Sequence, residues 1–130
     1  MSYEDKKVLV VEDNEMNRML VTMALAEYDI VPDEAEDGRQ AYTMYMDKPE
    51  GYYDLILMDM LMPVMGGEEA TGMIRGSERA DAATIPIIAM TAESDADEIA
   101  RYPEIGMSGY LEKPMDDEAL FSALQQYLGD

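Results

Sequence analysis

Two stretches decide the predicted fold: Val8-Leu9-Val10-Val11-Glu12-Asp13 and Leu55-Ile56-Leu57-Met58-Asp59. Each is a short apolar run that passes directly into acidic residues. Apolar runs of this length, bounded by turn residues, are typical of fully buried strands in a parallel sheet. The carboxyl ends of such strands lie along one edge of the sheet. The sequence therefore predicts that the carboxylates of Glu12, Asp13 and Asp59 converge on one site.

Two later apolar segments also end in polar residues. Residues 85–90 lead into Thr91, and residues 107–111 are followed by Lys113. At the same sheet edge, this hydroxyl and this ammonium group would join the three carboxylates. Carboxylate and phosphate oxygens are the ligands that Mg²⁺ prefers. The leading hypothesis from these residues is therefore a phosphate and metal site.

Strands and helices are predicted to alternate along the whole chain. The patterns indicate strands over 8–11, 30–35, 53–58, 85–90 and 107–111, and helices over 15–27, 38 to about 49, 68–75, 95–102 and 116–128. We expect Pro103 to end the fourth helix. Strict alternation predicts one α/β domain over residues 1–130, with a doubly wound parallel sheet in the strand order 2-1-3-4-5. In this order Asp13 and Asp59 are neighbours.

The first predicted helix carries a stripe at helical spacing. Its members are Met16, Met19, Leu20, Met23, Ala24 and Glu27, and Asn14 stands where an N-cap belongs. The chain contains 14 methionines, and we expect most of them to fill gaps in the core. A methionine-rich binding groove is the less favoured interpretation.

Composition excludes several classes of function. With 29 acidic and 9 basic residues the formal net charge is -20, which argues against direct binding to a nucleic acid. No cysteine and no histidine is present, so disulfides, a Ser-His-Asp triad and a His-ligated metal are excluded. No apolar run is long enough for membrane insertion, and a cytoplasmic location is the default expectation.

The predicted acid pair favours a bound cation. Two carboxylates about 4 Å apart repel by roughly 4 kcal/mol at an effective dielectric constant of about 20. Either a proton or a cation must relieve this repulsion. A buried structural acid pair is the alternative, but acids at strand ends are reachable from solvent, which favours Mg²⁺. Asp59 is then the candidate nucleophile, because a carboxylate can form an aspartyl phosphate.

Four motifs at these positions resemble those of response-regulator receiver domains. They are Val10-Val11-Glu12-Asp13-Asn14, Leu57-Met58-Asp59-Met60-Leu61-Met62-Pro63, Met90-Thr91-Ala92 and Gly109-Tyr110-Leu111-Glu112-Lys113-Pro114. The resemblance covers essentially the whole chain and is strongest to the receivers of hybrid sensor histidine kinases. It implies a flavodoxin-like fold and a phosphoacceptor domain of a two-component or phosphorelay system. Such a domain is not an enzyme beyond catalysing its own phosphorylation and dephosphorylation.

The resemblance assigns the metal and the acceptor. It implies that Asp59 accepts the phosphoryl group and that Asp13, Asp59 and the backbone carbonyl of Leu61 bind Mg²⁺, with Mn²⁺ as a substitute. It also implies that Glu12 helps through water. Leu61 and Glu93 flank the route of the attacking water, so we expect them to influence the lifetime of the phosphoryl group.

The resemblance also assigns the switch and the partner. Thr91 and Lys113 are implied to bind the phosphoryl group, Thr91 and Tyr110 to form the switch, and Lys113-Pro114 to be a cis peptide. The switched surface is the face of helix four, strand five and the last helix. Because the chain has no histidine, a histidine kinase or a histidine phosphotransfer protein is the implied donor.

Three departures and two alternatives remain open. Gly66 and Gly72 stand where the family commonly has Asp and Arg, and Pro103 falls inside the usual fourth helix. A degenerate receiver would bind partners without being phosphorylated. A Mg²⁺-dependent phosphatase of the haloacid-dehalogenase type would need an acid two positions after Asp59, where this chain has Leu61.

Overall fold

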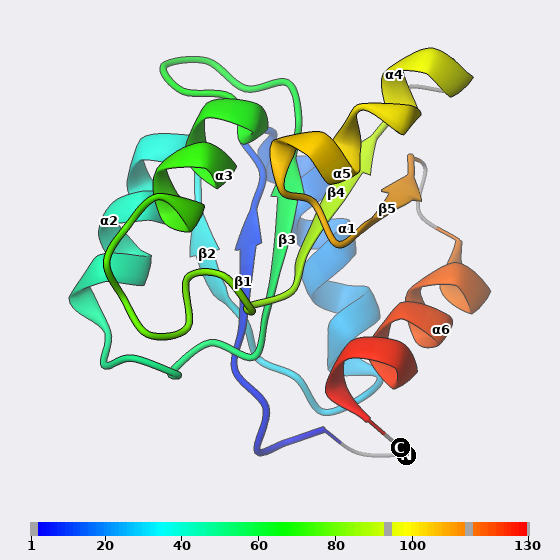
Figure 1. The fold of residues 1–130 in the computed structure, drawn as a ribbon. Helices are drawn as coiled ribbons and strands as arrows, with labels where there is room; N and C mark the ends of the chain where they lie inside the picture. The colour runs from blue at the N-terminus through cyan, green and yellow to red at the C-terminus, as the bar shows by residue number, and fades with distance from the viewer. Residues whose placement is uncertain (1–2, 93–94, 114–115, 130) are drawn as a thin grey trace.

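One five-stranded parallel sheet forms the centre of the molecule, with helices on both faces (Figure 1). The computed structural model describes residues 3–92, 95–113 and 116–129. The strands are β1 (Val8–Val11), β2 (Asp33–Ala35), β3 (Leu55–Asp59), β4 (Ile87–Thr91) and β5 (Gly109–Glu112). The helices are α1 (Glu15–Ala26), α2 (Gly38–Asp47), α3 (Gly67–Arg75), α4 (Ala96–Ala100), α5 (Tyr102–Ile105) and α6 (Asp117–Leu128).

The strand order is β2-β1-β3-β4-β5, and every neighbouring pair is parallel. The predicted α/β class and strand order are confirmed. In the β1–β3 pair Val11 lies opposite Met58, so the residues after β1 meet the end of β3 at one edge of the sheet. Strand bounds differ from the prediction by a few residues: β2 begins at Asp33, after Pro32, and β4 extends through Thr91.

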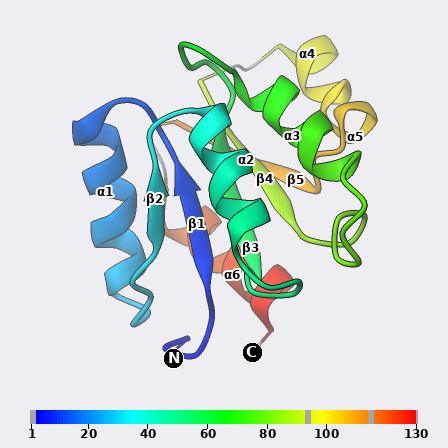
Figure 2. The same cartoon turned by 90° about the vertical axis from the view of Figure 1, so that its left-hand side faces the viewer.

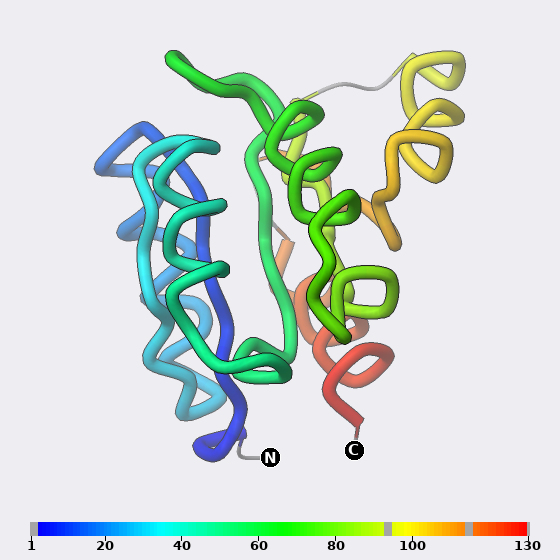
Figure 3. The backbone as a smooth tube through the Cα atoms, turned by 60° about the vertical axis from the view of Figure 1, so that its left-hand side comes forward, coloured from blue at the N-terminus to red at the C-terminus, as the bar shows by residue number. Residues whose placement is uncertain are grey.

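Each face of the sheet has its own apolar core. α1 and α6 cover one face, and α2, α3 and α5 cover the other (Figures 1 and 2). The first core contains Val21 and Leu25 of α1 and Leu120 and Leu124 of α6. Both described ends of the chain lie at the edge opposite the carboxyl ends of the strands (Figure 3). All residues of β1, β3 and β4 are buried, which makes these strands a rigid base for the groups at their ends.

Glycines set the approach of two helices to the carboxyl edge. A Cβ atom on Gly67 would lie 2.4 Å from the backbone oxygen of Asp59, and one on Gly38 would lie 2.6 Å from the backbone oxygen of Met65. No other residue fits such a close backbone approach. The amino-terminal end of α3 therefore packs directly against the end of β3.

The fourth predicted helix is divided in two. α4 covers only Ala96–Ala100, and Pro103 lies in the first turn of α5 instead of ending the helical segment. The expectation that Pro103 ends the helix was wrong. Proline has no N–H group to continue the α4 hydrogen-bond ladder, yet it is tolerated in the first turn of a new helix. The helical path therefore breaks at Arg101 and resumes.

The methionine stripe of α1 faces solvent. Met16, Met19, Leu20 and Met23 are 55 to 71% exposed, whereas Val21 and Leu25 are buried. Helical spacing identified an apolar stripe correctly, but α1 has two apolar faces, and the other one packs on the sheet. The expectation that most methionines fill the core holds for Met58, Met65, Met90 and Met107 and fails for those on α1.

The longest helices of the described residues, α1 and α6, have 12 residues each. A bilayer span takes about 20 apolar residues. Within the described part of the chain, no helix has the length and apolar character needed to cross a membrane.

Candidate metal and phosphate site

A cleft of about 620 Å³ opens at the carboxyl ends of β1, β3 and β4. Its lining includes the three acids that follow β1 and end β3, together with residues from the loops and from α5. Among the lining residues are Glu12, Asp13, Asp59, Leu61, Thr91, Arg101, Tyr102 and Lys113. The residues that the sequence places after four of the strands therefore lie in one cleft.

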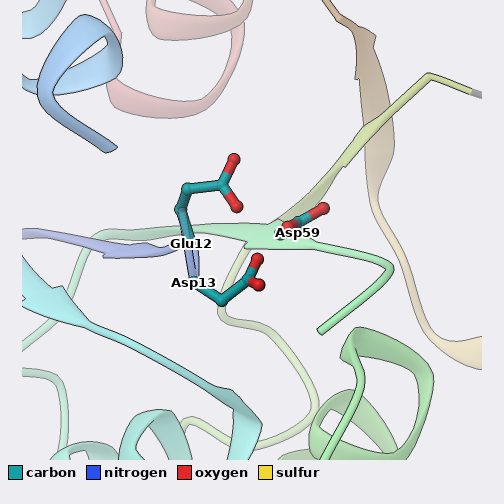
Figure 4. A group of neighbouring side chains, drawn as sticks. All are labelled: Glu12, Asp13 and Asp59. Carbon is teal, nitrogen blue, oxygen red and sulfur yellow. The ribbon is translucent and has the colours of Figure 1, made fainter. Parts of the chain in front are cut away.

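Three carboxylates meet in this cleft (Figure 4). One oxygen from each of Glu12, Asp13 and Asp59 lies within 4.8 Å of the others. Glu12 is fully buried and Asp59 is 4% exposed, whereas Asp13 is exposed. Adjacent strands β1 and β3 carry them, so the meeting follows from the strand order. The predicted convergence of these acids is observed.

Lys113 closes the cluster from β5. Its Nζ donates to Oε1 of Glu12 at 2.8 Å and to Oδ1 of Asp59 at 2.9 Å. The backbone N–H of Lys113 donates to the carbonyl of Thr91 at 2.7 Å, which ties the lysine to the end of β4. Four strand ends thus contribute to one site. This is the arrangement that the strand-end positions in the sequence predict.

The electrostatics of the cluster favour one shared proton. Burial and the neighbouring Glu12 raise the pKa of Asp59 to about 7. Lys113 acts in the opposite direction but has a smaller effect. Burial opposes ionisation of Glu12 as well, but hydrogen bonds with Asp59 and Lys113 bring the pKa of Glu12 below its ordinary value. Lys113 also has a raised pKa, because its bonds to both carboxylates outweigh its burial. Of the two buried carboxyl groups, Asp59 is therefore the one with the raised pKa and Glu12 the one with the lowered pKa.

One carboxylate oxygen supports a hard cation at this site. Oε2 of Glu12 is buried and has no hydrogen-bond partner among the described residues. Buried polar atoms are almost always satisfied by protein, water or an ion. The donor set of clustered carboxylate oxygens suits Mg²⁺. The side chains present therefore fit such a cation.

The position two residues after Asp59 lies at the mouth of the cleft. The backbone N–H of Leu61 is 3.4 Å from Oδ1 of Asp59, and the Leu61 side chain is 85% exposed. Leu61 offers no acid for proton transfer. Its roles in metal binding and in phosphoryl lifetime stay predictions. Glu93 and Pro114, for which a lifetime role and a cis peptide were expected, lie outside the described residues.

The switch residues contact a third residue that the sequence analysis missed. Oη of Tyr102, on α5, donates to Oγ1 of Thr91 at 3.1 Å. The rings of Tyr102 and Tyr110 meet edge to face, with 6.2 Å between their centroids. No motif marks Tyr102, because it lies eleven residues after Thr91 and no local sequence pattern links the two. Only the presence of Pro103 draws attention to this segment.

Comparison with known proteins agrees with this geometry. The model of the response regulator receiver domain matches residues 8–125, and the chain belongs to this family. The two-component response regulator ORR41 of Oryza sativa subsp. japonica is 37% identical over 123 residues, which cover 93% of each protein. The domain is thus a receiver of the two-component and phosphorelay systems.

Receivers of histidine kinases are also similar. The peroxide stress-activated histidine kinase mak3 of Schizosaccharomyces pombe is 36% identical over 123 residues, or 94% of this chain and 5% of the kinase. The chain therefore spans a small fraction of the kinases it matches. The receiver domain of sensor histidine kinase PA1611 from Pseudomonas aeruginosa PAO1 superposes with a TM-score of 0.84 at 33% identity, covering 96% of this chain and 98% of that one. In that structure a magnesium ion is coordinated in the active site cleft.

Proposed function

We propose that Asp59 accepts a phosphoryl group from a phosphohistidine of a histidine kinase or a histidine phosphotransfer protein, with Mg²⁺ as cofactor. The carrying observation is the preformed cluster in which Lys113 Nζ lies within 2.9 Å of an oxygen of both buried carboxyl groups. In this cluster Asp59 would be the nucleophile, Glu12 its charged neighbour, and Lys113 the cation that meets the incoming phosphoryl group. The proposal places the domain in the cytoplasm, where ATP supplies such donors.

The acids of the cluster would hold the metal. Asp13 and Asp59 would bind Mg²⁺, or Mn²⁺, directly together with the carbonyl of Leu61, and Glu12 would take part through water. The unsatisfied Oε2 of Glu12 supports this assignment. A divalent ion bound there supplies positive charge to the phosphoryl oxygens.

The proposed transfer is a displacement at phosphorus. An ionised carboxylate oxygen of Asp59 attacks the phosphorus, and the bond from phosphorus to the histidine nitrogen breaks while the nitrogen keeps the electron pair. The attack needs the ionised carboxylate, so the proton on Asp59 must leave first. The ammonium group of Lys113 would then contact a phosphoryl oxygen instead of the free carboxylate of Asp59. The hydroxyl of Thr91 would donate to another.

The surface beside the cleft fits a helical donor. The exposed apolar face of α1, formed by Met16, Met19, Leu20 and Met23, borders a groove of about 450 Å³ that Leu20 and Lys113 both line. A donor must bring its histidine to Asp59 and so must cover this side of the cleft. An apolar helix face of this kind suits a second amphipathic helix. We assign the α1 face to docking of the phosphohistidine domain.

Phosphorylation would act through a change of population. The phosphoryl group adds about −1.5 to −2 charges beside Thr91 and Lys113. Thr91 and Tyr110 would change arrangement together, and the face of α4, β5 and α6 would present the result to a downstream protein. The activity ends there, because Leu61 stands where a phosphatase of the haloacid-dehalogenase type needs its acid.

Phosphoryl transfer from a radiolabelled histidine phosphotransfer protein tests the proposal. With Mg²⁺ present, the parent domain is expected to take up label, and Asp59→Asn to lose at least about 100-fold of the rate, since the nucleophile is gone. Asp54→Asn is the matched control, because Asp54 precedes the opposite end of the same strand. Equal labelling of parent and Asp59→Asn contradicts the assignment. If the parent takes up no label and does not bind beryllofluoride in the presence of Mg²⁺, the degenerate receiver is favoured.

A further inference from the structure

We infer that Tyr102 is a positioning residue: its hydroxyl holds Thr91 in the resting arrangement, and its ring passes any movement of Thr91 to Tyr110. This inference rests on the proposed function. It adds a residue to the switch and changes how the switch works. Tyr110 responds to Tyr102 and not to a space that Thr91 leaves behind.

Burial makes the bond between Tyr102 and Thr91 specific. Both residues are 5% exposed, and Oη of Tyr102 donates to Oγ1 of Thr91 at 3.1 Å. Away from water, a hydroxyl that loses its partner is penalised more strongly than an exposed one. The resting positions of Thr91 and Tyr102 therefore depend on each other.

The backbone around Tyr102 is held by hydrogen bonds that involve residues outside the lining of the cleft. The carbonyl of Tyr102 accepts from the N–H groups of Gly106 at 3.1 Å and Met107 at 2.9 Å. Arg75 of α3 donates to the carbonyl of Gly106 from Nε at 3.0 Å and from Nη2 at 2.8 Å. These bonds anchor the carboxyl end of α5. The Tyr102 hydroxyl is consequently presented to Thr91 from a fixed backbone.

Movement of Thr91 toward a phosphoryl group on Asp59 would strain this arrangement. Thr91 ends β4, and the preceding residue, Met90, lies opposite Asp59, so a phosphoryl group on Asp59 would lie beside Thr91 at the carboxyl edge of the sheet. If the Thr91 hydroxyl turns to the phosphoryl group, the bond from Tyr102 lengthens or breaks. Tyr102 then changes position against Tyr110, whose ring it contacts at a 62° interplanar angle.

Tyr110 is where this change reaches the surface. Its side chain belongs to β5 and Tyr110 is 43% exposed. A ring shift at Tyr102 therefore alters a residue that a partner can touch. The route from Asp59 to the surface therefore passes through Thr91 first, then Tyr102 and finally Tyr110. In the unphosphorylated domain, the same hydrogen bond from Tyr102 disfavours the position of Thr91 that a phosphoryl group in the cleft would require.

The test is a titration of Tyr102→Phe with beryllofluoride in the presence of Mg²⁺. The variant keeps the ring and removes only the hydroxyl. We expect about fivefold tighter binding than in the parent, the size of one net buried hydrogen bond. Tyr53→Phe is the matched control, because Oη of Tyr53 donates to Asp33 at 2.7 Å, remote from the cleft. That control should bind like the parent.

NMR distinguishes this role from a merely structural one. In Tyr102→Phe without ligand, the methyl resonance of Thr91 and the ring resonances of Tyr110 should move part of the way to their beryllofluoride-bound positions. In Tyr102→Leu, which lacks the ring, the Thr91 methyl should still respond to beryllofluoride while Tyr110 does not.

The outcomes separate the two proposals. Binding by the parent, with equal or weaker binding by Tyr102→Phe, overturns the role of Tyr102 and leaves the proposed function intact. A Tyr110 response in Tyr102→Leu equal to that of the parent overturns the route through the ring. Failure of the parent itself to bind beryllofluoride overturns the proposed function and, with it, this inference.

Discussion

The carboxylate cleft lies between two unlike helical elements. On one side α1 is a continuous 12-residue helix with an apolar outer face, anchored by Val21 and Leu25. On the other side α4 and α5 have five and four residues, and α4 has no buried residue. A helix with few buried contacts opens at lower free energy than one packed on a core. The α1 side is therefore suited to docking, and α4 is the element beside the cleft that rearranges at lower free energy.

Both sides carry ion pairs, and on α1 Arg18 contacts Glu34 at 3.1 Å. Arg101, at the break between α4 and α5, contacts Glu98 at 3.0 Å and Glu68 of α3 at 3.3 Å. These ion pairs are exposed and contribute little to stability. On the α1 side, Asn14 caps the helix by accepting from the N–H of Asn17 at 2.9 Å. Under the proposed function, delivery of the phosphoryl group and the response to it would use separate surfaces around one acid cluster.

Lys113 joins Glu12 and Asp59 to Thr91 at the end of β4, so its removal should have the largest effect. Lys113→Ala is expected to lower the affinity for beryllofluoride about 100-fold, as loss of one charge-stabilising donor does. Mg²⁺ binding should persist, since the three carboxylates remain. In that variant, phosphorylation should no longer change the affinity for a partner.

Titrations with Mg²⁺ alone and with Mg²⁺ and beryllofluoride measure both effects, with Lys48→Ala as the control. Lys48 lies over the ring of Tyr52, at 5.0 Å from its centroid, and does not line the cleft. A Lys113→Ala domain whose partner affinity still responds to phosphorylation as the parent does would show that the lysine does not couple the two sides.

The α1 side is expected to govern delivery alone. Leu20→Glu places a charge on the proposed docking face and should slow transfer from a phosphorylated histidine phosphotransfer protein about tenfold, because a charge in an apolar contact is penalised. Transfer from acetyl phosphate, which needs no docking, should be unchanged. Rates with the two donors give the measurement.

Val31→Glu is the matched control, since Val31 is 89% exposed and precedes β2 at the opposite edge of the sheet. Equal slowing with both donors would mean that Leu20 supports the cleft itself. Equal slowing by both variants with the protein donor would mean that the added negative charge acts at long range.

The cluster between the two sides should destabilise the domain at alkaline pH. The pKa of Asp59 is raised to about 7, so the folded state binds a proton more tightly than the unfolded state. The contribution of Asp59 to the stability of the parent must then fall as the pH rises from about 4 to about 7. Without divalent ions, Asp59→Asn should exceed the parent in free energy of unfolding by about 1 to 2 kcal/mol at pH 8 and match it near pH 4.

Urea unfolding of both proteins between pH 4 and pH 8 measures this difference. Mg²⁺ should reduce it at pH 8 by stabilising the parent. A variant whose advantage is independent of pH would show that the repulsion between Glu12 and Asp59 is not its source.

Much of the site could be predicted because its residues follow strands. Glu12 and Asp59 end up adjacent through the strand order alone, and Lys113 reaches them because its strand, β5, runs parallel to the others. The surroundings were less predictable. The break between α4 and α5 depends on how the segment after Pro103 packs, and proline is compatible both with the end of one helix and with the start of another.

The sequence by itself determined the strands, their order and the family, because buried parallel strands leave continuous apolar runs and the acceptor motifs follow them directly. Only the tertiary structure decided which apolar face of α1 packs on the sheet, and that Tyr102 bonds to Thr91. Both depend on contacts between segments, which helical spacing does not encode. The periodicity of a helix shows that a stripe is apolar, but the neighbouring elements select the stripe that is buried.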